Sequence, residues 1–426
     1  MSITNSLYIG VSGLQAHGEA ISVVGDNIAN ASTIGYKRNR AEFADMLGGE
    51  INGQRLGGGV RMPGTQTMWE QGAVTQTGGS LDLAIRGGGL FIVKGNHGGQ
   101  NAQYYTRDGR FNLDNQGFVT NQQGLRLQGF AIDGSGTRAL TAGDLPLGAR
   151  QSPPVASTAS TMAVNLDANA PAMPPFDPAN PNTTSNFATS ETVYDSLGAA
   201  HHVDVFFRSQ GAGAWEFHAM VDGADLTGGT PGAATEIANG SLTFNAFGAL
   251  DTQAVNASSA DFVNANPGQA IAFNFGDDIA TGGTGIAGST QNAAPSSVLS
   301  LDVDGHSAGK LTNIQISDDG KIRGLFDNGD KIDIAQLALA DFANEEGLNR
   351  VGDGLVMETP TSGKPVIDVP GTGARGAVSS GALEASNVDL GNELVTLIAY
   401  QRAFQANAKT VTTADEMMAD INNLKR

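Results

Sequence analysis

Residues 387–424 are NVDLGNELVTLIAYQRAFQANAKTVTTADEMMADINNL, and large apolar side chains recur in this segment at steps that sum to seven. They are Leu390, Leu394, Leu397, Phe404, Val411 and Met418. This spacing keeps side chains on one narrow stripe of a helix, as in the seam of a coiled coil. The segment has no Pro, and its last Gly is Gly391. We therefore predict one helix of roughly 55 Å.

The N-terminal end of the chain carries a matching stripe. Its members are Leu7, Val11, Leu14, Ile21 and Ile28, and we call them, together with the six C-terminal residues, the seam. Gly18 and Gly25 fall on the same stripe. Each costs about 1 kcal/mol relative to Ala, so this helix should be marginal alone. The two helices could fold back onto a globular core, but two thin stripes so far apart in sequence favour pairing, within or between chains.

Composition excludes several classes of function. The chain has 426 residues, 40% of them apolar, which is enough for two or three domains with true cores. Its formal charge of −19 excludes a protein that tracks nucleic-acid phosphates. The acid is concentrated between residues 151 and 294, where Arg208 is the only basic residue, whereas both ends are nearly neutral. We expect the acidic middle to face water and the ends to be able to approach one another.

The sequence shows no sign of membrane insertion or a cleaved signal. No apolar run reaches the 18 to 20 residues that cross a bilayer. The first ten residues, MSITNSLYIG, lack both the basic start and the apolar block of a secretory signal. There is no cysteine, so disulfides are excluded. This absence also suggests a chain that crosses compartments or is assembled outside the cell.

Between the two helices, short apolar runs bounded by glycine and hairpin-type turns predict β structure. A proline-rich boundary at residues 152–154 opens a second β region, and the first β pattern returns near residue 313. The fold class is therefore multidomain α+β, with terminal helices pairing as a coiled coil and two nested all-β domains. The predicted parts are a helical coiled-coil domain (1–35 plus 382–426), an extended connector (36–78 plus 360–381), an inner β domain (79–150 plus 296–359) and an inserted outer acidic β domain (151–295).

Several motifs in the outer layers resemble the rod and hook proteins of the bacterial flagellar axis. They are Asn27-Ile28-Ala29-Asn30, Thr33-Ile34-Gly35-Tyr36-Lys37, Ser80 to Ile85, Ser386 to Leu390, and Gln401 to Asn407. The insertion carries Thr192 to Gly198, His201 and Trp215-Glu216-Phe217, and is similar to the inserted domain of hook proteins. The resemblance marks Asn27, Asn30, Thr33, Gly35, Tyr36, Asn387, Gln401, Arg402 and Asn407 as family motif residues.

The resemblance implies a mechanical function. Such proteins polymerise with themselves into a hollow, flexible helical tube, a universal joint that transmits torque from rod to filament. It also implies the distal rod, the hook cap, the hook–filament junction proteins and the flagellar type III export apparatus as partners. The expected location is extracellular, in the hook and basal body, after export without a cleaved signal peptide. No nucleic acid, membrane or cofactor is expected to take part.

Three alternatives are weighed against this hypothesis. A distal rod subunit would share the terminal motifs but lack the long insertion. An extracellular adhesin or binding module would need one anchoring end rather than two pairing helices. An enzyme would need a catalytic or metal-binding constellation, and the six histidines show no spacing that gathers ligands on one face. Asp302, Asp304 and Gly305 lack the remaining ligands of a calcium loop. We therefore predict no enzymatic activity.

Overall fold

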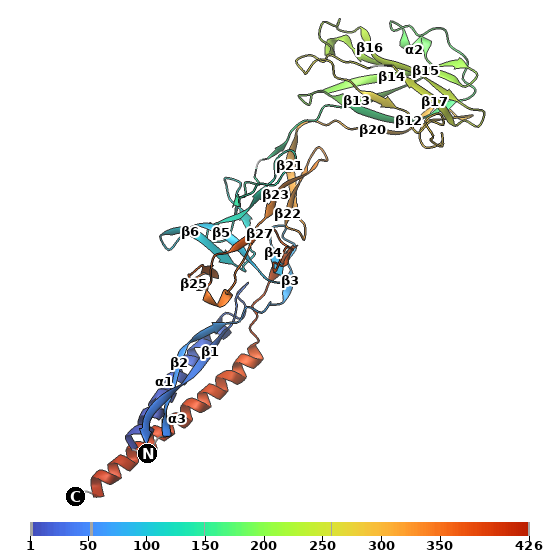
Figure 1. Cartoon of the computed structure of the whole chain (residues 1–426). Helices are drawn as coiled ribbons and strands as arrows, with labels where there is room; N and C mark the ends of the chain where they lie inside the picture. The colour runs from blue at the N-terminus through green and yellow to red at the C-terminus, as the bar shows by residue number, and fades with distance from the viewer. Residues whose placement is uncertain (1–2, 52–53, 149, 257, 425–426) are drawn as a thin grey trace. The chain divides into compact units, whose positions relative to one another are not determined.

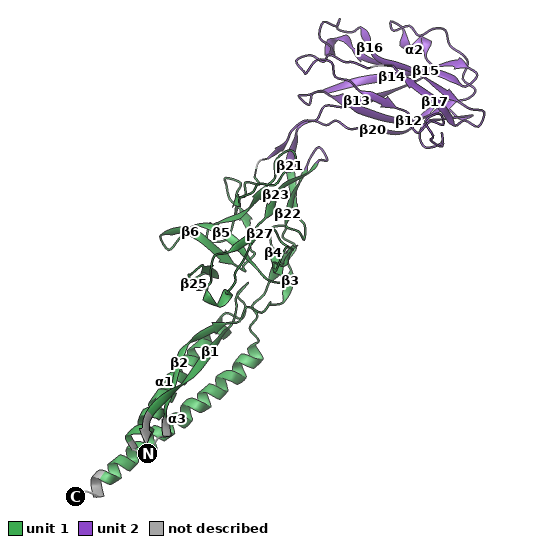
Figure 2. Ribbon diagram, viewed as in Figure 1, with its two compact units in different colours: residues 1–149, 312–325, 331–426 green, residues 150–311, 326–330 purple. Residues whose placement is uncertain are grey.

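The computed structural model describes residues 3–51, 54–148, 150–256 and 258–424. Residues 1, 2, 425 and 426 of the predicted helical segments lie outside this range. The described chain is mostly β, with long helices at its two ends (Figure 1). It divides into two compact units (Figure 2). The first comprises residues 1–149, 312–325 and 331–426, and the second comprises residues 150–311 and 326–330.

The first unit contains the two long helices, a hairpin and a larger set of strands. The helices and hairpin are α1 (Ile3–Ala29), α3 (Leu390–Leu424), β1 (Asn39–Ile51) and β2 (Gln54–Thr67). The strands before the second unit are β3 (Val74–Gln76), β4 (Leu83–Arg86), β5 (Leu90–His97), β6 (Gln100–Thr106), β7 (Asn112–Leu113), β8 (Val119–Thr120), β9 (Arg126–Ala131) and β10 (Gly143–Asp144). Those after it are β23 (Lys331–Leu337), β24 (Leu339–Asp341), β25 (Asn349–Gly352), β26 (Leu355–Met357), β27 (Val366–Asp368), β28 (Ala377–Ser380) and β29 (Ala382–Glu384), with a 3₁₀ turn at Glu345–Gly347.

The β1–β2 hairpin differs from the extended connector that the sequence predicted for this region. The two strands pair antiparallel with several bulges, and β2 packs along α1. Strand β2 approaches α1 closely at Ser12, whose Oγ accepts a hydrogen bond from the Val60 backbone N–H at 3.2 Å. A Cβ on the neighbouring Gly59 would lie 2.1 Å from that Oγ, so only glycine fits there. In this glycine-rich stretch, which the sequence predicted to be a connector, Gly59 instead allows the strand to contact the helix.

Most strands of the first unit belong to one sheet around a small core, apart from the separate pairs β1–β2, β4–β28 and β3–β29. Within that sheet, β23, β9, β5, β6, β26 and β25 are neighbours in this order, and β24 also pairs with β5. The glycine-bounded apolar run of residues 90–93 lies within β5, and residues 104–106 lie within β6. Both pack apolar faces into the interior, where Leu90, Ile92 and Tyr105 are buried with Phe342. Short pairs, β28 with β4 and β29 with β3, join the C-terminal part of the chain to this region.

The second unit consists of two small sheets. Its elements are β11 (Gln151–Ser152), β12 (Ala159–Asp167), α2 (Pro181–Thr184), β13 (Phe187–Tyr194), β14 (Ala200–Gly211), β15 (Ala214–Asp222), β16 (Ala234–Phe244), β17 (Leu250–Val255), β18 (Ala272–Asn274), β19 (Thr290–Asn292) and β20 (Ser297–Val303). Strands β21 (Gly309–Ile316) and β22 (Lys321–Phe326) each include residues of both units. Because β20 pairs with β12, residues 297–303 belong to this unit, whereas the sequence placed them in the inner β domain.

Alternating side chains build the core of the second unit. Strands β13 to β17 form an antiparallel meander in chain order. On β15, Trp215, Phe217 and Ala219 are fully buried, as the two-residue period of a half-buried strand requires. The turn before β14 is held by Asp195, whose Oδ1 accepts hydrogen bonds from the backbone N–H groups of Leu197 and Ala199. An aspartate suits this turn because its carboxylate can accept from backbone N–H groups two and four positions on.

Glu191 is an ionisable group inside that core, and it yields a prediction. Its side chain is 2% exposed, Oε2 accepts a hydrogen bond from Ser160 Oγ at 2.6 Å, and Oε1 has no partner. Burial raises the pKa of Glu191 above its ordinary value of 4.5. As the pH rises past that value, the unfolded chain releases this proton before the folded chain does. The folded state therefore loses stability until its own pKa is passed.

We accordingly expect Glu191→Gln to stabilise the chain at pH 7 by on the order of 1 kcal/mol, as measured by thermal unfolding. The advantage should shrink toward pH 4, where the wild-type carboxyl is also protonated. Asp251→Asn, at an exposed position on β17, serves as the control and should show no such advantage. An advantage of Glu191→Gln that did not change with pH would contradict the assignment.

Candidate functional site

The helices α1 and α3 pack against each other along a line of small side chains on α1. Gly10, Gly13, Ala16 and Ala20 of α1 are buried. A Cβ at Gly10 would lie 2.8 Å from Val411 Cγ2, and one at Gly13 would lie 2.6 Å from Asn407 Cγ. Only glycine at these two positions lets the helices come so close. Helix α1 contacts both α3 and the hairpin, and the three run together in Figure 1.

The seam coincides with this contact line only in part, because Val411 faces Gly10 but most other seam residues of α3 do not lie in the contact. On α1, Leu7, Leu14, Ile21 and Ile28 are partly buried and Val11 is 43% exposed. On α3, Leu397 and Val411 are partly buried, whereas Leu390, Leu394, Phe404 and Met418 are all at least 36% exposed. Val395, Ile398, Met417 and Ile421 are exposed as well. A single chain therefore leaves most of the apolar surface of α3 open.

The motif residues at the end of α1 form a polar junction. Asn27 is 1% exposed, its Oδ1 accepts from the Asn39 backbone N–H at 2.9 Å, and its Nδ2 donates to Glu393 Oε2 of α3 at 3.2 Å. The hydroxyl of Tyr36 donates to Asp26 Oδ2 at 2.9 Å. Asn27 thus connects the first helix, the hairpin and the last helix through one buried amide.

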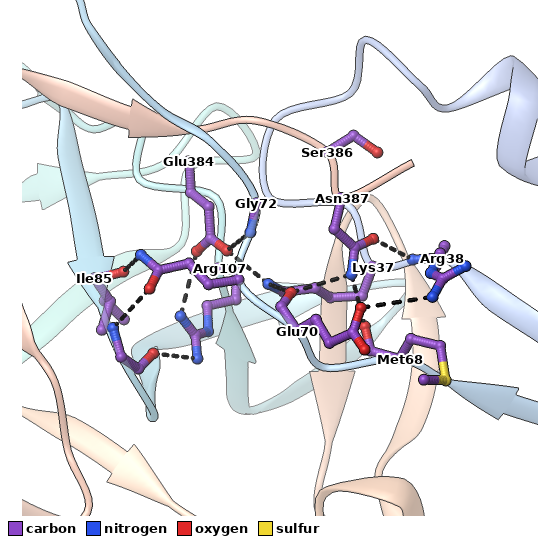
Figure 3. A network of polar contacts seen from close by, with 12 residues as sticks. Lys37, Arg38, Met68, Glu70, Gly72, Ile85, Arg107, Glu384, Ser386 and Asn387 are labelled. Carbon is purple, nitrogen blue, oxygen red and sulfur yellow. Dashed lines mark hydrogen bonds and ion pairs between the residues drawn. The ribbon is translucent and has the colours of Figure 1, made fainter. Parts of the chain in front are cut away.

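A buried ion cluster lies beside this junction (Figure 3). Glu384 is fully buried, with Oε1 at 2.6 Å from Lys37 Nζ and Oε2 at 3.2 Å from Arg107 Nη1. Its Oε1 also accepts from the Gly72 backbone N–H at 2.9 Å, and Lys37 Nζ donates to the Glu70 carbonyl at 2.7 Å. Both carboxylate oxygens are therefore fully engaged, as a buried charge requires.

Asn387 joins the start of the C-terminal segment to the same place. Its Oδ1 accepts from the Arg38 backbone N–H at 2.8 Å. Its Nδ2 donates to the carbonyls of Met68 at 2.8 Å and Glu70 at 3.1 Å (Figure 3). An asparagine is suited to this position because its amide donates and accepts at once. Asn387, one of the family motif residues, thus joins the start of the C-terminal segment to residues 38–70.

Burial perturbs two of the groups at the junction. Desolvation lowers the pKa of Lys37, and the charge and hydrogen bond of Glu384 act in the opposite direction. Desolvation and the hydrogen bond to Asp26 raise the pKa of Tyr36 to about 12. Tyr36 is therefore a neutral donor at physiological pH. The polar groups at the junction therefore have defined hydrogen-bond roles, and we interpret the junction as structural.

The remaining motif residues have separate positions. Asn30 Nδ2 donates to the Asp26 carbonyl at 2.9 Å, and Thr33 Oγ1 donates to Asn30 Oδ1 at 3.0 Å, so both close the end of α1. Gly35 has φ +68°, and a Cβ there would lie 2.7 Å from the Arg107 carbonyl carbon. Asn407 faces Gly13 across the helix pair. Gln401 and Arg402 are exposed on α3.

Sequence reasoning missed Glu384 and Arg107. Lys37 had been quoted within a motif, but without a partner. A signal was present in Ala382-Leu383-Glu384-Ala385, where one carboxylate stands among small and apolar residues. Such a carboxylate is rarely buried unless it is paired. The identity of its partners could not be found from the sequence, because Lys37 lies nearly 350 positions away.

The described residues contain no group of three or more His, Asp or Glu side chains arranged to hold a metal ion. Within the described part of the chain, no helix is both long and apolar enough to pass through a bilayer. Histidines in the second unit contact carboxylates singly or in pairs, as His201 does with Asp195 and Asp225 at 3.3 Å each. His201 also stacks on Phe262, with ring centroids 4.0 Å apart.

Four family models match the chain in order. The flagella basal body rod protein model covers residues 7–37, and the flagellar hook protein FlgE/F/G D1 domain covers residues 84–170. The flagellar basal body protein FlaE D2 domain covers residues 165–306, and the C-terminal model of the flagellar basal body rod FlgEFG protein covers residues 379–424. The first and last matches contain every motif residue at the helix ends and on α3.

Curated relatives match along nearly the whole length. The flagellar hook protein FlgE of Escherichia coli strain K12 is 34% identical, with 97% of this chain and 98% of the relative covered. The FlgE of Treponema pallidum is also 34% identical, with 99% of each covered. The fold, the motif junction and these matches define a flagellar axial protein of the rod and hook class. The chain belongs to the flagellar hook protein family and is a structural subunit of the bacterial flagellar hook, which confirms the resemblance stated above.

Solved structures show weaker likeness. The crystal structure of the Helicobacter pylori flagellar hook protein FlgE2 is 14% identical, with a TM-score of 0.47 over 73% of this chain and all of that one. A 32 kDa fragment of the Caulobacter crescentus FlgE has a TM-score of 0.24. The assignment therefore depends on the sequence relatives and on the family models.

Proposed function

We propose that the chain polymerises into a hollow, flexible helical tube that acts as a universal joint and transmits torque from the rod to the filament. The observation that carries this proposal is the exposed apolar surface of α3. Eight large apolar side chains on that helix are at least 36% exposed in the single chain. A soluble monomer rarely leaves so many on one helix, and covering them with further copies removes them from water.

In the proposed tube, the terminal helices form an inner coiled-coil layer and the β regions lie outside it. The exposed seam residues of α3, such as Leu390, Leu394 and Met418, would contact α1 and α3 of neighbouring copies, because the contact between α1 and α3 of one chain leaves them open. We propose that the outer regions of neighbouring subunits meet through small, polar contacts, which would suit a joint whose subunits must slide past one another. The relatives are structural hook proteins, and we propose no enzymatic activity for this chain.

We further propose the partners that the family implies. These are the distal rod, the hook cap, the hook–filament junction proteins and the export apparatus, with the hook of the flagellum outside the cell as the location. Export would proceed without a cleaved signal peptide. A distal rod subunit or an adhesin is the less favoured alternative, because the relatives that match over the full length are named hook proteins.

A comparison of two chains tests the proposal. Full-length protein incubated at high concentration should form tubes visible by negative-stain microscopy. A version lacking residues 1–30 and 387–426 should stay monomeric while it keeps the circular dichroism of folded β structure. If the full-length chain remained monomeric at every concentration, or if the truncated one formed the same tubes, the proposal would be wrong.

A further inference from the structure

A groove of about 510 Å³ lies along the C-terminal half of α3, where that helix passes the start of α1. Ser6 of α1 contributes to its wall. The α3 residues that line it are mostly small, and they are Ala406, Lys409, Thr410, Thr413, Ala414 and Met417. The groove is continuous with the contact between α1 and α3, because Ala414 is buried and Val411, three residues earlier, meets Gly10. It is therefore an open surface of low charge at the edge of an existing helix pair.

The N-terminal half of α3 carries the opposite kind of surface. Leu394, Val395 and Ile398, which we call the apolar cluster, are 49%, 68% and 50% exposed. Ile398 lies three and four residues beyond the other two, so all three share one side of the helix. Large apolar side chains that are exposed together indicate an interaction surface. The apolar cluster complements the groove in size, because large side chains pack into the space that small ones leave.

A single chain cannot bring its apolar cluster into its own groove. Both lie on one continuous helix, and Leu394 and Thr410 are sixteen residues apart, or roughly 24 Å along its axis. The exposed surface of α1 offers little in exchange, since beyond Val11 its exposed side chains are small or polar, among them Gln15 and Glu19. The groove of another copy therefore provides the matching surface.

Charged side chains continue both surfaces toward the C-terminus. Arg402 lies four residues beyond Ile398 on the same side of α3, is exposed, and has no ion-pair partner among the described residues. Glu416 and Asp420 are exposed and lie three and seven residues beyond Thr413, at the end of the groove. A cation thus follows the apolar cluster, and two carboxylates follow the groove.

We propose that the α3 helices of neighbouring copies pack in parallel, shifted by about sixteen residues, with the apolar cluster of one copy in the groove of the next. This shift places Leu394 opposite Thr410, and it brings Arg402 level with the two carboxylates. Reversing one helix would instead bring Arg402 close to Lys409 of the other copy, so like charges would meet. The proposal rests on the proposed assembly into tubes, and it sets the offset between the two helices at roughly 24 Å.

Introduced cysteines test the register, because the chain has none of its own. Subunits with Leu394→Cys are mixed with subunits with Thr410→Cys, assembled under reducing conditions and then oxidised. We expect disulfide-linked dimers in the tubes, with the joined peptides identified by mass spectrometry, because the shift brings the two Cα atoms within the roughly 7 Å that a disulfide allows. Thr412→Cys, at an exposed position outside the groove, is the matched control for Thr410→Cys and should give few dimers.

A charge exchange tests the direction of the helices without changing an apolar side chain. Arg402→Glu should raise the critical concentration for tube formation about tenfold, because it places a third carboxylate beside Glu416 and Asp420. Adding Glu416→Arg to that variant should restore the critical concentration to within about threefold of the wild-type value. Lys364→Glu makes the same change of charge outside α3 and should leave the critical concentration unchanged.

Two results would overturn this proposal alone. Leu394→Cys might be joined to Thr412→Cys as often as to Thr410→Cys, which would contradict the register. Arg402→Glu might not be improved by Glu416→Arg, which would contradict the parallel direction. Failure of the wild-type chain to form tubes would overturn the proposed function, and this proposal with it.

Discussion

Replacing Glu384 by alanine should destabilise the first unit by about 3–5 kcal/mol. The side chain is fully buried, and its removal leaves Lys37 Nζ and Arg107 Nη1 as buried cations without a counter-charge. The same carboxylate also accepts from the Gly72 backbone N–H at 2.9 Å, so one further donor is left unpaired. Urea unfolding, monitored by circular dichroism, measures the loss.

Glu70→Ala is the matched control for this prediction. Glu70 pairs with Arg38 at 3.5 Å, but its side chain is 64% exposed, and such pairs contribute about 1 kcal/mol at most. Lys37→Met combined with Glu384→Ala should cost less than the sum of the two single changes, because one of the two buried cations is then absent and only Arg107 is left without its partner. Equal losses from Glu384→Ala and Glu70→Ala would show that burial does not set the strength of this cluster.

Placing a charge on the seam should abolish assembly while the β regions stay folded. Leu394 and Phe404 lie ten residues apart on α3, and in the single chain they are 49% and 39% exposed. Leu394→Asp or Phe404→Asp therefore costs the monomer less than it costs an interface in which the side chain is fully covered. In a packed interface between copies, the same carboxylate would be desolvated without a partner, at a cost of several kcal/mol. Sedimentation and negative-stain microscopy should find no tubes.

The neighbouring position provides the control for these seam variants. Gln405 is exposed and lies off the seam, so Gln405→Asp adds the same charge to the same helix at a polar site. We expect it to form tubes at nearly the wild-type concentration. Thermal unfolding of all three monomers should be alike. If Leu394→Asp or Phe404→Asp formed tubes as readily as Gln405→Asp, the seam would not be the assembly surface.

The sequence predicted those helices and strands whose apolar residues recur at a regular spacing within a short stretch. The heptad steps of residues 387–424 predicted a long helix, and α3 spans Leu390–Leu424. Short apolar runs bounded by glycine and turns predicted β structure between the helices, and β15, with Trp215 and Phe217 buried, is one of its strands. The hairpin at residues 39–67 was missed, because its glycines weaken every local β signal. Its strands are stabilised by packing on α1, a contact in which Gly59 meets Ser12.

The sequence by itself determined the two long helices, the β character between them, the uneven charge and the family. These features follow from the spacing of apolar residues, from the residue types found in turns and from short motifs. Each of them can be recognised within a few neighbouring positions. Only the tertiary structure decided that α1 meets α3 through Gly10 and Gly13, and that Lys37, Arg107 and Glu384 share one buried cluster. Burial and ion pairing depend on what the fold brings into contact, and here those residues come from opposite ends of the chain.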